Sequence, residues 1–168
     1  MKKSGQDGFT LVELLIGLAL TTLLLQALFP LLSTSLLSSR SSVSRTVVHQ
    51  TARMAVEAMT RDLRFASSVS SPTVGTTTSS IHFQRPGAGG KLETLIFQLG
   101  LPQGTYHQTL YRIIAPGQST PLTQNVVSDL RFEFYEPRMV GIVLTVTDPD
   151  TGVADTMETT VTCANLSD

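Results

Sequence analysis

Hydrophobic and polar residues divide the chain into three stretches with different periodicities. From residue 9 to 32 nearly every position is apolar, and Glu13 is the one charged side chain. After a Ser- and Thr-rich stretch, apolar or small residues recur at helical spacing, at Val48, Ala52, Ala55, Met59, Leu63 and Ala66. Beyond residue 68, short alternating segments between turn residues predict antiparallel strands. This order predicts an α+β fold in which a long helix precedes a β head.

The apolar stretch is long enough to cross a membrane. A helix over residues 9–32 measures about 36 Å at roughly 1.5 Å per residue, and a hydrocarbon core is about 30 Å thick. Lys2 and Lys3 precede this helix, so the positive-inside rule keeps the short leader in the cytoplasm and places the head outside. The alternative, a secretory signal, has a shorter apolar region and a small-residue cleavage site on its far side. We therefore expect a single-pass protein with an extracytoplasmic head.

Glu13 is the most informative residue of this helix. A charged side chain deep in the bilayer costs roughly 2.5 to 3.5 kcal/mol on insertion scales, so Glu13 needs a partner. Cleavage after Gly8 creates one, the ammonium group of Phe9. In a bundle of such helices, the ammonium of one subunit can neutralise Glu13 of a neighbour, because burying both charges is tolerable only when they are paired. A solitary helix has only its own terminus for this purpose, so the arrangement predicts assembly.

The run Gly8-Phe9-Thr10-Leu11-Val12-Glu13, after a Lys-containing leader, closely resembles the prepilin cleavage and methylation signal of type IV pilins and type II secretion pseudopilins. The resemblance implies that prepilin peptidase cleaves between Gly8 and Phe9 and methylates the new amine of Phe9. It also implies that Glu13 guides docking with other pilins or pseudopilins on an inner-membrane assembly platform. The protein would first reside in the bacterial inner membrane and then in a periplasmic or cell-surface filament.

Pro30 falls where many of these pilins have a helix-kinking proline. Independently of the family, Pro30 removes one helix hydrogen bond and clashes with the preceding turn, so a bend or a locally melted stretch is expected. The resulting division is a leader peptide (1–8), a transmembrane and assembly helix (9–32), an amphipathic continuation (33–68) and an antiparallel β head (69–168). The Ser- and Thr-rich residues 33–44 leave a flexible linker as the alternative to a continuous helix. The resemblance implies one long helix whose second half packs on the sheet.

Period-2 alternation in the head predicts six strands that form a meander on one side of the helix. Leu130, Phe132 and Phe134 alternate with polar residues, which predicts one buried and one exposed face. Turn residues are concentrated at 86–90, 100–104, 115–121 and 148–152. The strands are expected at residues 80–84, 92–99, 105–114, 126–135, 140–147 and 155–163.

The head lacks a recognisable catalytic constellation, and we expect no enzyme activity. Three histidines, His49, His82 and His107, fall on the helix and two different strands without metal-ligand spacing. Cys163 is the only cysteine, which excludes an intrachain disulfide, and its apolar and Thr-rich surroundings predict a small core residue. On the helix, Arg53, Glu57 and Arg61, at spacings of four, predict a solvated ionic face.

One candidate cation site lies near the C-terminus. Asp148 and Asp150, with Asp155 close behind, surround a Pro- and Gly-containing turn and concentrate the oxygen ligands that calcium prefers. The same residue types are also what a hairpin turn requires. No other cofactor is expected.

The charge of the head and the local sequence of the helix favour some classes of function over others. Residues 69–168 contain five basic and nine acidic residues, a formal charge of -4, which disfavours nucleic-acid binding, although Arg112, Arg131 and Arg138 can still cluster. The stretch 52–66 most resembles minor subunits, namely the type II secretion pseudopilin J and the minor pilin W groups. The leading hypothesis is a minor pilin or pseudopilin that initiates or caps a filament. The alternative is a pilin whose head mediates adhesion or DNA uptake in competence, and a single-span membrane enzyme is the outlying third.

Overall fold

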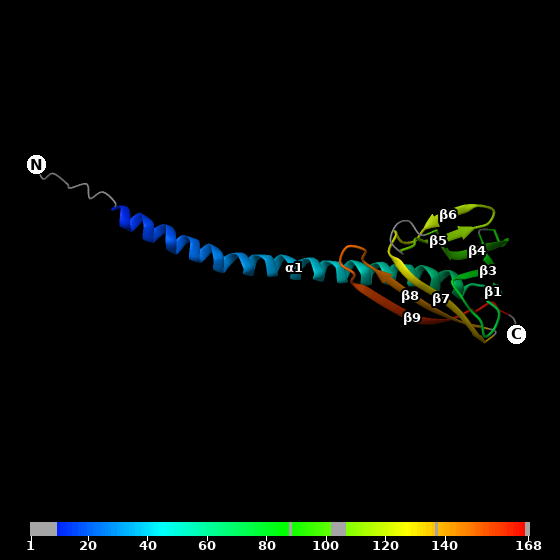
Figure 1. The fold of residues 1–168 in the computed structure, drawn as a ribbon. Helices are drawn as coiled ribbons and strands as arrows, with labels where there is room; N and C mark the ends of the chain where they lie inside the picture. Colours follow the sequence, from blue (N-terminus) through cyan, green and yellow to red (C-terminus); the bar gives the residue numbers. More distant parts are fainter. Residues whose placement is uncertain (1–9, 88, 102–106, 137, 167–168) are drawn as a thin grey trace, which may run out of the picture. The chain divides into compact units, whose positions relative to one another are not determined.

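The computed structural model describes residues 10–87, 89–101, 107–136 and 138–166. The chain divides into two compact units, one up to Ser42 and one from Val43 onward, which we describe separately. The described residues form one helix followed by nine strands (Figure 1). The elements are α1 (Leu11–Arg64), β1 (Ser68–Ser71), β2 (Thr77–Thr78), β3 (Ser80–Pro86), β4 (Leu92–Leu99), β5 (Leu110–Ile114), β6 (Gln118–Pro121), β7 (Val127–Glu136), β8 (Met139–Thr147) and β9 (Ala154–Thr162).

The Ser- and Thr-rich stretch is helical rather than a flexible linker, because α1 continues through it without interruption. Ser42 Oγ donates to the Ser38 carbonyl oxygen at 3.0 Å, so this hydroxyl bonds back to the helix. The helix ends at Arg64, before the expected residue 68. Its last turn tightens through the Ala66 N–H bond to the Leu63 carbonyl at 2.9 Å, and Ser67 N then bonds to Gln84 O of β3.

The head contains two antiparallel sheets instead of the single meander expected from the sequence. The strand order is β1-β3-β4-β5-β6 in the first sheet and β2-β7-β8-β9 in the second. Strand β4 coincides with its prediction, and β3, β7, β8 and β9 lie within two residues of theirs at each end. Within the predicted strand 105–114, β5 begins only at Leu110, a single bridge joins Gln108 to Val127, and residues 105–106 lie outside the described part.

Sequence periodicity missed three short strands. Two of them, β1 and β2, occupy a Ser- and Thr-rich stretch without apolar alternation. The third, β6, falls in the stretch predicted to be a turn, and all four of its residues are exposed. Alternation signals a half-buried strand, so an exposed edge strand that buries no side chain gives no such signal.

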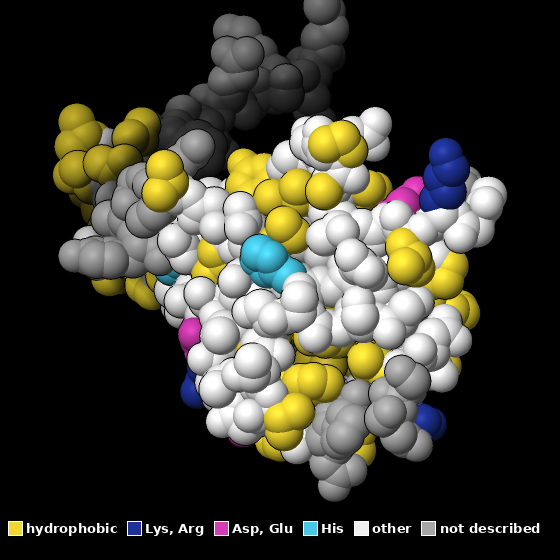
Figure 2. All heavy atoms as spheres, turned by 90° about the vertical axis from the view of Figure 1, so that its right-hand side faces the viewer, with side chains coloured by type: hydrophobic (Ala, Val, Ile, Leu, Met, Phe, Trp, Pro, Cys, Tyr) yellow, Lys and Arg dark blue, Asp and Glu magenta, His cyan; other side chains and the backbone are white. Residues whose placement is uncertain are grey.

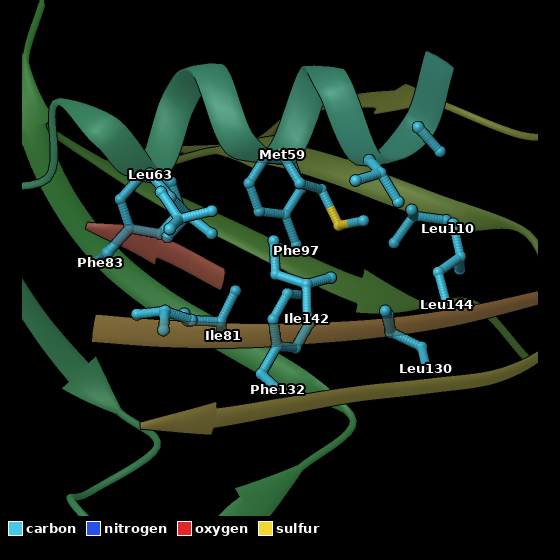
Figure 3. Packing of buried hydrophobic residues seen from close by; sticks show 14 of the residues in the cluster. Met59, Leu63, Ile81, Phe83, Phe97, Leu110, Leu130, Phe132, Ile142 and Leu144 are labelled. Carbon is cyan, nitrogen blue, oxygen red and sulfur yellow. The ribbon is translucent and has the colours of Figure 1, made fainter. Parts of the chain in front are cut away.

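The core lies between α1 and both sheets, as Figure 3 shows for Met59 and Leu63 above side chains from the strands. All six helix positions expected to be apolar are buried. Phe83 and Phe97 stack with ring centroids 5.7 Å apart. The alternation in β7 is confirmed, because Leu130, Phe132 and Phe134 are buried. Burial of these residues accounts for the packing of the helix on the head without a disulfide.

An ion cluster that the sequence did not reveal lies at the edge of this core. Asp62 is only 2% exposed, and its two carboxylate oxygens accept hydrogen bonds from different arginines. Arg85 Nη1 of β3 lies 2.6 Å from Oδ1, and Arg112 Nε of β5 lies 2.6 Å from Oδ2. The cluster therefore joins α1 to two strands of the first sheet through charge-assisted bonds.

Replacing Asp62 with Ala should destabilise the head strongly. The change leaves two largely buried guanidinium groups without their carboxylate. Breaking a buried ion pair in this way lowers the free energy of unfolding by about 3–5 kcal/mol. Labelling of the single, buried Cys163 by a thiol reagent along a urea series measures the unfolding of the detergent-solubilised chain. Asp129→Ala is the matched control. Asp129 pairs with Arg131 at an exposed site, so its replacement should lower the free energy of unfolding by less than about 1 kcal/mol. Equal losses in the two variants would contradict this role of Asp62.

Candidate assembly site on the N-terminal helix

The first turn of α1 holds Glu13 next to a helix cap. Thr10 Oγ1 accepts a hydrogen bond from the Glu13 N–H at 3.3 Å, and the Thr10 carbonyl accepts from Glu13 N and Leu14 N at 3.1 and 3.2 Å. Thr10 is thus the N-cap and Glu13 the third helical residue, the spacing of a capping box. A carboxylate in the first turn also interacts favourably with the helix dipole. The role of Thr10 was not among the predictions from the sequence, although the Thr-x-x-Glu pattern signals this cap.

Beyond this turn the helix exposes apolar side chains on all sides. The most apolar part of α1 buries none of its residues, and α1 is the one described helix long and apolar enough to cross a membrane. Leu14, Leu23 and Phe29 are 64%, 62% and 74% exposed. A helix that is apolar all round requires lipid or other apolar helices as its surroundings. Between Glu13 and Arg40 the chain has no charged residue, so Glu13 is the one carboxylate on this surface.

Two of the predicted processing residues, Gly8 and Phe9, lie outside the described residues. Pro30, in contrast, lies within α1, which continues through it as helix, so the locally melted alternative is not found. Ser33 Oγ and Thr34 Oγ1 donate to the Pro30 carbonyl at 3.0 and 2.8 Å. Such side-chain bonds to the preceding turn often accompany helix bending, and the bend at Pro30 stays a prediction.

Comparison with known proteins adds one finding. Residues 3–28 match the family model described as the prokaryotic N-terminal methylation motif. No curated protein and no solved structure matches the chain. The match supports a type IV prepilin-like chain. Together with the long helix and the antiparallel sheets of the head, it gives the protein an α+β type IV pilin-like fold.

The three carboxylates of the candidate calcium site in this prepilin-like chain do not converge. Asp155 Oδ2 lies 2.8 Å from His49 Nδ1 of the helix. Asp148 Oδ1 instead accepts a hydrogen bond from the Asp150 N–H at 2.9 Å within its own turn. Gly152, at a φ of 69°, donates to the Asp148 carbonyl and completes the turn. The described residues contain no group of three or more His, Cys, Asp or Glu side chains placed to hold a metal. The geometry favours the hairpin-turn alternative.

The remaining chemically active side chains are also dispersed. Cys163 is fully buried, and desolvation raises the pKa of its thiol to about 11, which suppresses the reactive thiolate at neutral pH. Arg112 bonds to Asp62 in the first sheet, while Arg131 of the second sheet pairs with Asp129 at 2.9 Å. Figure 2 shows one face of the head on which the described Lys and Arg side chains stand singly. No basic patch for nucleic acid forms on the part of this face that is described.

The turn at Asp148 provides a test of the head geometry. Hydrogen bonds, first from the Ser44 side chain and then from the Asp150 backbone, lower the pKa of Asp148 from 3.8 to about 2. Because the folded-state pKa is depressed, this carboxylate stabilises the head above about pH 4, and the contribution is lost as the pH falls toward 2. Ser44→Ala should raise the pKa of Asp148 toward its ordinary value, as measured by NMR titration of the carboxyl carbon. Ser68→Ala, remote from this turn, should leave it unchanged, and an unaltered titration in Ser44→Ala would refute the contact.

Proposed function

We propose that this structural subunit is a minor pilin or pseudopilin that helps to initiate or cap a type IV pilus or a type II secretion pseudopilus. The observation that carries the proposal is a single carboxylate, Glu13, in the first turn of an apolar helix whose start matches the methylation motif. Prepilin peptidase cleaves between Gly8 and Phe9 and methylates the amine of Phe9. The chain acts through assembly and not as an enzyme.

Pairing across subunits explains why the helix retains Glu13. Among the described residues Glu13 has no ion-pair partner, and it is exposed. Moving an unpaired carboxylate into an apolar helix bundle is costly, and the amine of Phe9 on a neighbouring subunit offsets that cost. The helix therefore docks other pilins or pseudopilins at the inner-membrane assembly platform, and the head lies on the extracytoplasmic side.

The minor-subunit assignment rests on the helix segment within the head. The stretch from Ala52 to Ala66 contains most of the buried positions of α1 and its end, and it resembles the corresponding part of pseudopilin J and of the minor pilin W group. Within the described part of the head, Arg112 and Arg131 lie in different sheets, each beside its own carboxylate. This separation favours a structural subunit over the alternative of a DNA-uptake pilin.

Replacing Gly8 with Val should abolish maturation. A peptidase that cleaves after Gly8 has to approach a backbone without a Cβ atom, and a branched side chain obstructs that approach. Intact-mass spectrometry of the protein from membranes and from sheared filaments should show a wild-type chain that begins at methylated Phe9. The variant should keep residues 1–8. A wild-type chain that retains residues 1–8, or that is cut beyond Leu32, would end the proposal.

Replacing Glu13 with Gln should separate maturation from assembly. The amide keeps the size of the side chain but cannot neutralise the amine of a neighbour, so incorporation into filaments should fall by at least about tenfold. Immunoblots of sheared filaments and of membranes measure incorporation, and mass spectrometry shows that Phe9 is still exposed by cleavage. Glu93→Gln is the matched control, because it removes the same charge from β4 of the head. Normal incorporation of Glu13→Gln would exclude the pairing role.

A further inference from the structure

The four sheet edges of the head differ in how well they are protected against pairing with another strand. Strands β1 and β6 have four residues each, β1 with an irregular register and β6 ending at Pro121, and β2 has two residues. In contrast, β9 runs for nine residues and pairs with β8 without a register shift. Natural sheets protect their edges with short strands, bulges and prolines. The β9 edge is long and regular, and it lacks all three.

Hydrogen bonds beside β9 show which of its backbone groups face outward. Cys163 N donates to Arg138 O at 2.8 Å, so residue 163 points toward β8. Because directions alternate along an antiparallel strand, Thr156, Glu158 and Thr160 direct their N–H and C=O groups to the open side. Ala164 N also points outward, and it donates to Arg64 O at the end of α1 at 2.9 Å. The helix end thus closes this edge just beyond β9 and leaves the strand itself open.

A groove runs between the outer flank of α1 and β9. It contains a hollow of about 770 Å³ lined by His49, Arg53 and Asp155 among others, and a second hollow of about 400 Å³ lined by Glu57, Arg61, Arg64, Phe65 and Thr159. The contact of His49 with Asp155 lies at one end of β9, and the hydrogen bond from Ala164 N to Arg64 O lies at the other. A strand added to β9 would therefore lie over the flank of α1.

The groove has a positive wall on an acidic head. Arg45, Arg53, Arg61 and Arg64 line it from the helix, and within the described residues only Arg53 has a carboxylate partner, Glu57 at 2.8 Å. Phe65, 52% exposed, adds an aromatic surface near the end of the groove. The side chains of β9 that face the opposite way include Glu158, which lines a different hollow with Tyr135. The groove therefore complements an extended segment with acidic side chains on one face.

We propose that the edge of β9 accepts an extended acidic segment of another filament subunit as an additional strand of the second sheet. Main-chain hydrogen bonds to Thr156, Glu158 and Thr160 hold the segment, and its acidic side chains face Arg61 and Arg64 on α1. The proposal rests on the proposed function for the identity of the partner. The β9 edge itself is a property of the head, so it is tested without maturation or filaments.

The test uses the full chain in detergent and a labelled, terminally blocked peptide in which Thr alternates with Glu. Fluorescence anisotropy measures binding, and NMR amide exchange in β9 locates it. Thr160→Pro removes an outward N–H without breaking the bonds to β8, and it should weaken binding by at least about tenfold. Thr160→Val keeps this N–H and should bind like the wild type. Equal affinities of the two variants, or protection at strands other than β9, would overturn the site.

Charge provides the second arm of this test. Arg61→Glu should weaken binding of the Glu-containing peptide by at least about fivefold at low salt, and the effect should shrink as salt screens the charges. Lys91→Glu makes the same reversal of charge at an exposed residue just before β4 of the first sheet and should have no effect. A peptide that alternates Thr with Lys should bind more weakly than the Glu peptide. Equal binding of the two peptides, or self-association of the chain that Thr160→Pro abolishes, would reject the acidic partner.

Discussion

The bond of one buried carboxylate to two arginines determines how the helix joins the head. Asp62 projects from the flank of α1 and receives Arg85 from β3 and Arg112 from β5, so three elements distant in sequence share one charge cluster. Apolar packing of Met59 and Leu63 is non-directional, and by itself it leaves the rotation of the helix weakly defined. Charge-assisted bonds are directional, so Asp62 favours one orientation of the helix face. That orientation also exposes Arg53 and Arg61 on the flank beside β9.

Two of the acidic residues of α1, Glu13 and Asp62, follow the same physical rule in different surroundings. A carboxylate removed from water needs compensating charge and hydrogen bonds. Asp62 obtains both within the chain, and it is a structural residue. Glu13 lies on the apolar surface of the other unit, and in the described residues only the Thr10 cap and the first helical turn lie beside it. In the proposed assembly the amine of Phe9 on a neighbouring subunit compensates this charge, which connects the sequence motif with the proposed function.

The sequence predicted those parts of the fold that have a hydrophobic period. The buried stripe from Val48 to Leu63, the alternation in β7 and the whole of β4 are confirmed, because burial of one face leaves a pattern that can be counted. The division into two sheets was not predicted, since the pairing of β2 with β7 depends on contacts between distant residues. Asp62 was also missed. Asp62 stands in the sequence between Arg61 and Arg64, where a run of charged residues is typical of a solvated helix surface, and its partners Arg85 and Arg112 lie on strands distant in sequence.

The sequence also predicted only a part of the candidate sites, because it does not reveal which distant residues contact each other. Glu13 stood out because a charge in an apolar run is conspicuous, whereas the cap at Thr10 was missed although the Thr-x-x-Glu pattern signals it, and the hydrogen bond to Glu13 N shows it. The calcium hypothesis grouped Asp155 with Asp148 because they are close in sequence, and this proximity did not reveal the contact of Asp155 with His49 on the helix. Hydrophobic periodicity does not indicate which residues that are distant in sequence pair with each other.

Among the residues that the structure describes, two groups are left without a compensating partner, and both are of a kind that another chain can satisfy. In one unit the open group is the carboxylate of Glu13, and in the other it is the outward backbone of β9 beside Arg61 and Arg64. An enzyme typically concentrates perturbed groups in a concave site that excludes water. Here Cys163 is buried and the described histidines do not converge with carboxylates into a site of that kind. Uncompensated groups at a surface, rather than groups that converge in a pocket, are typical of a protein that binds other chains.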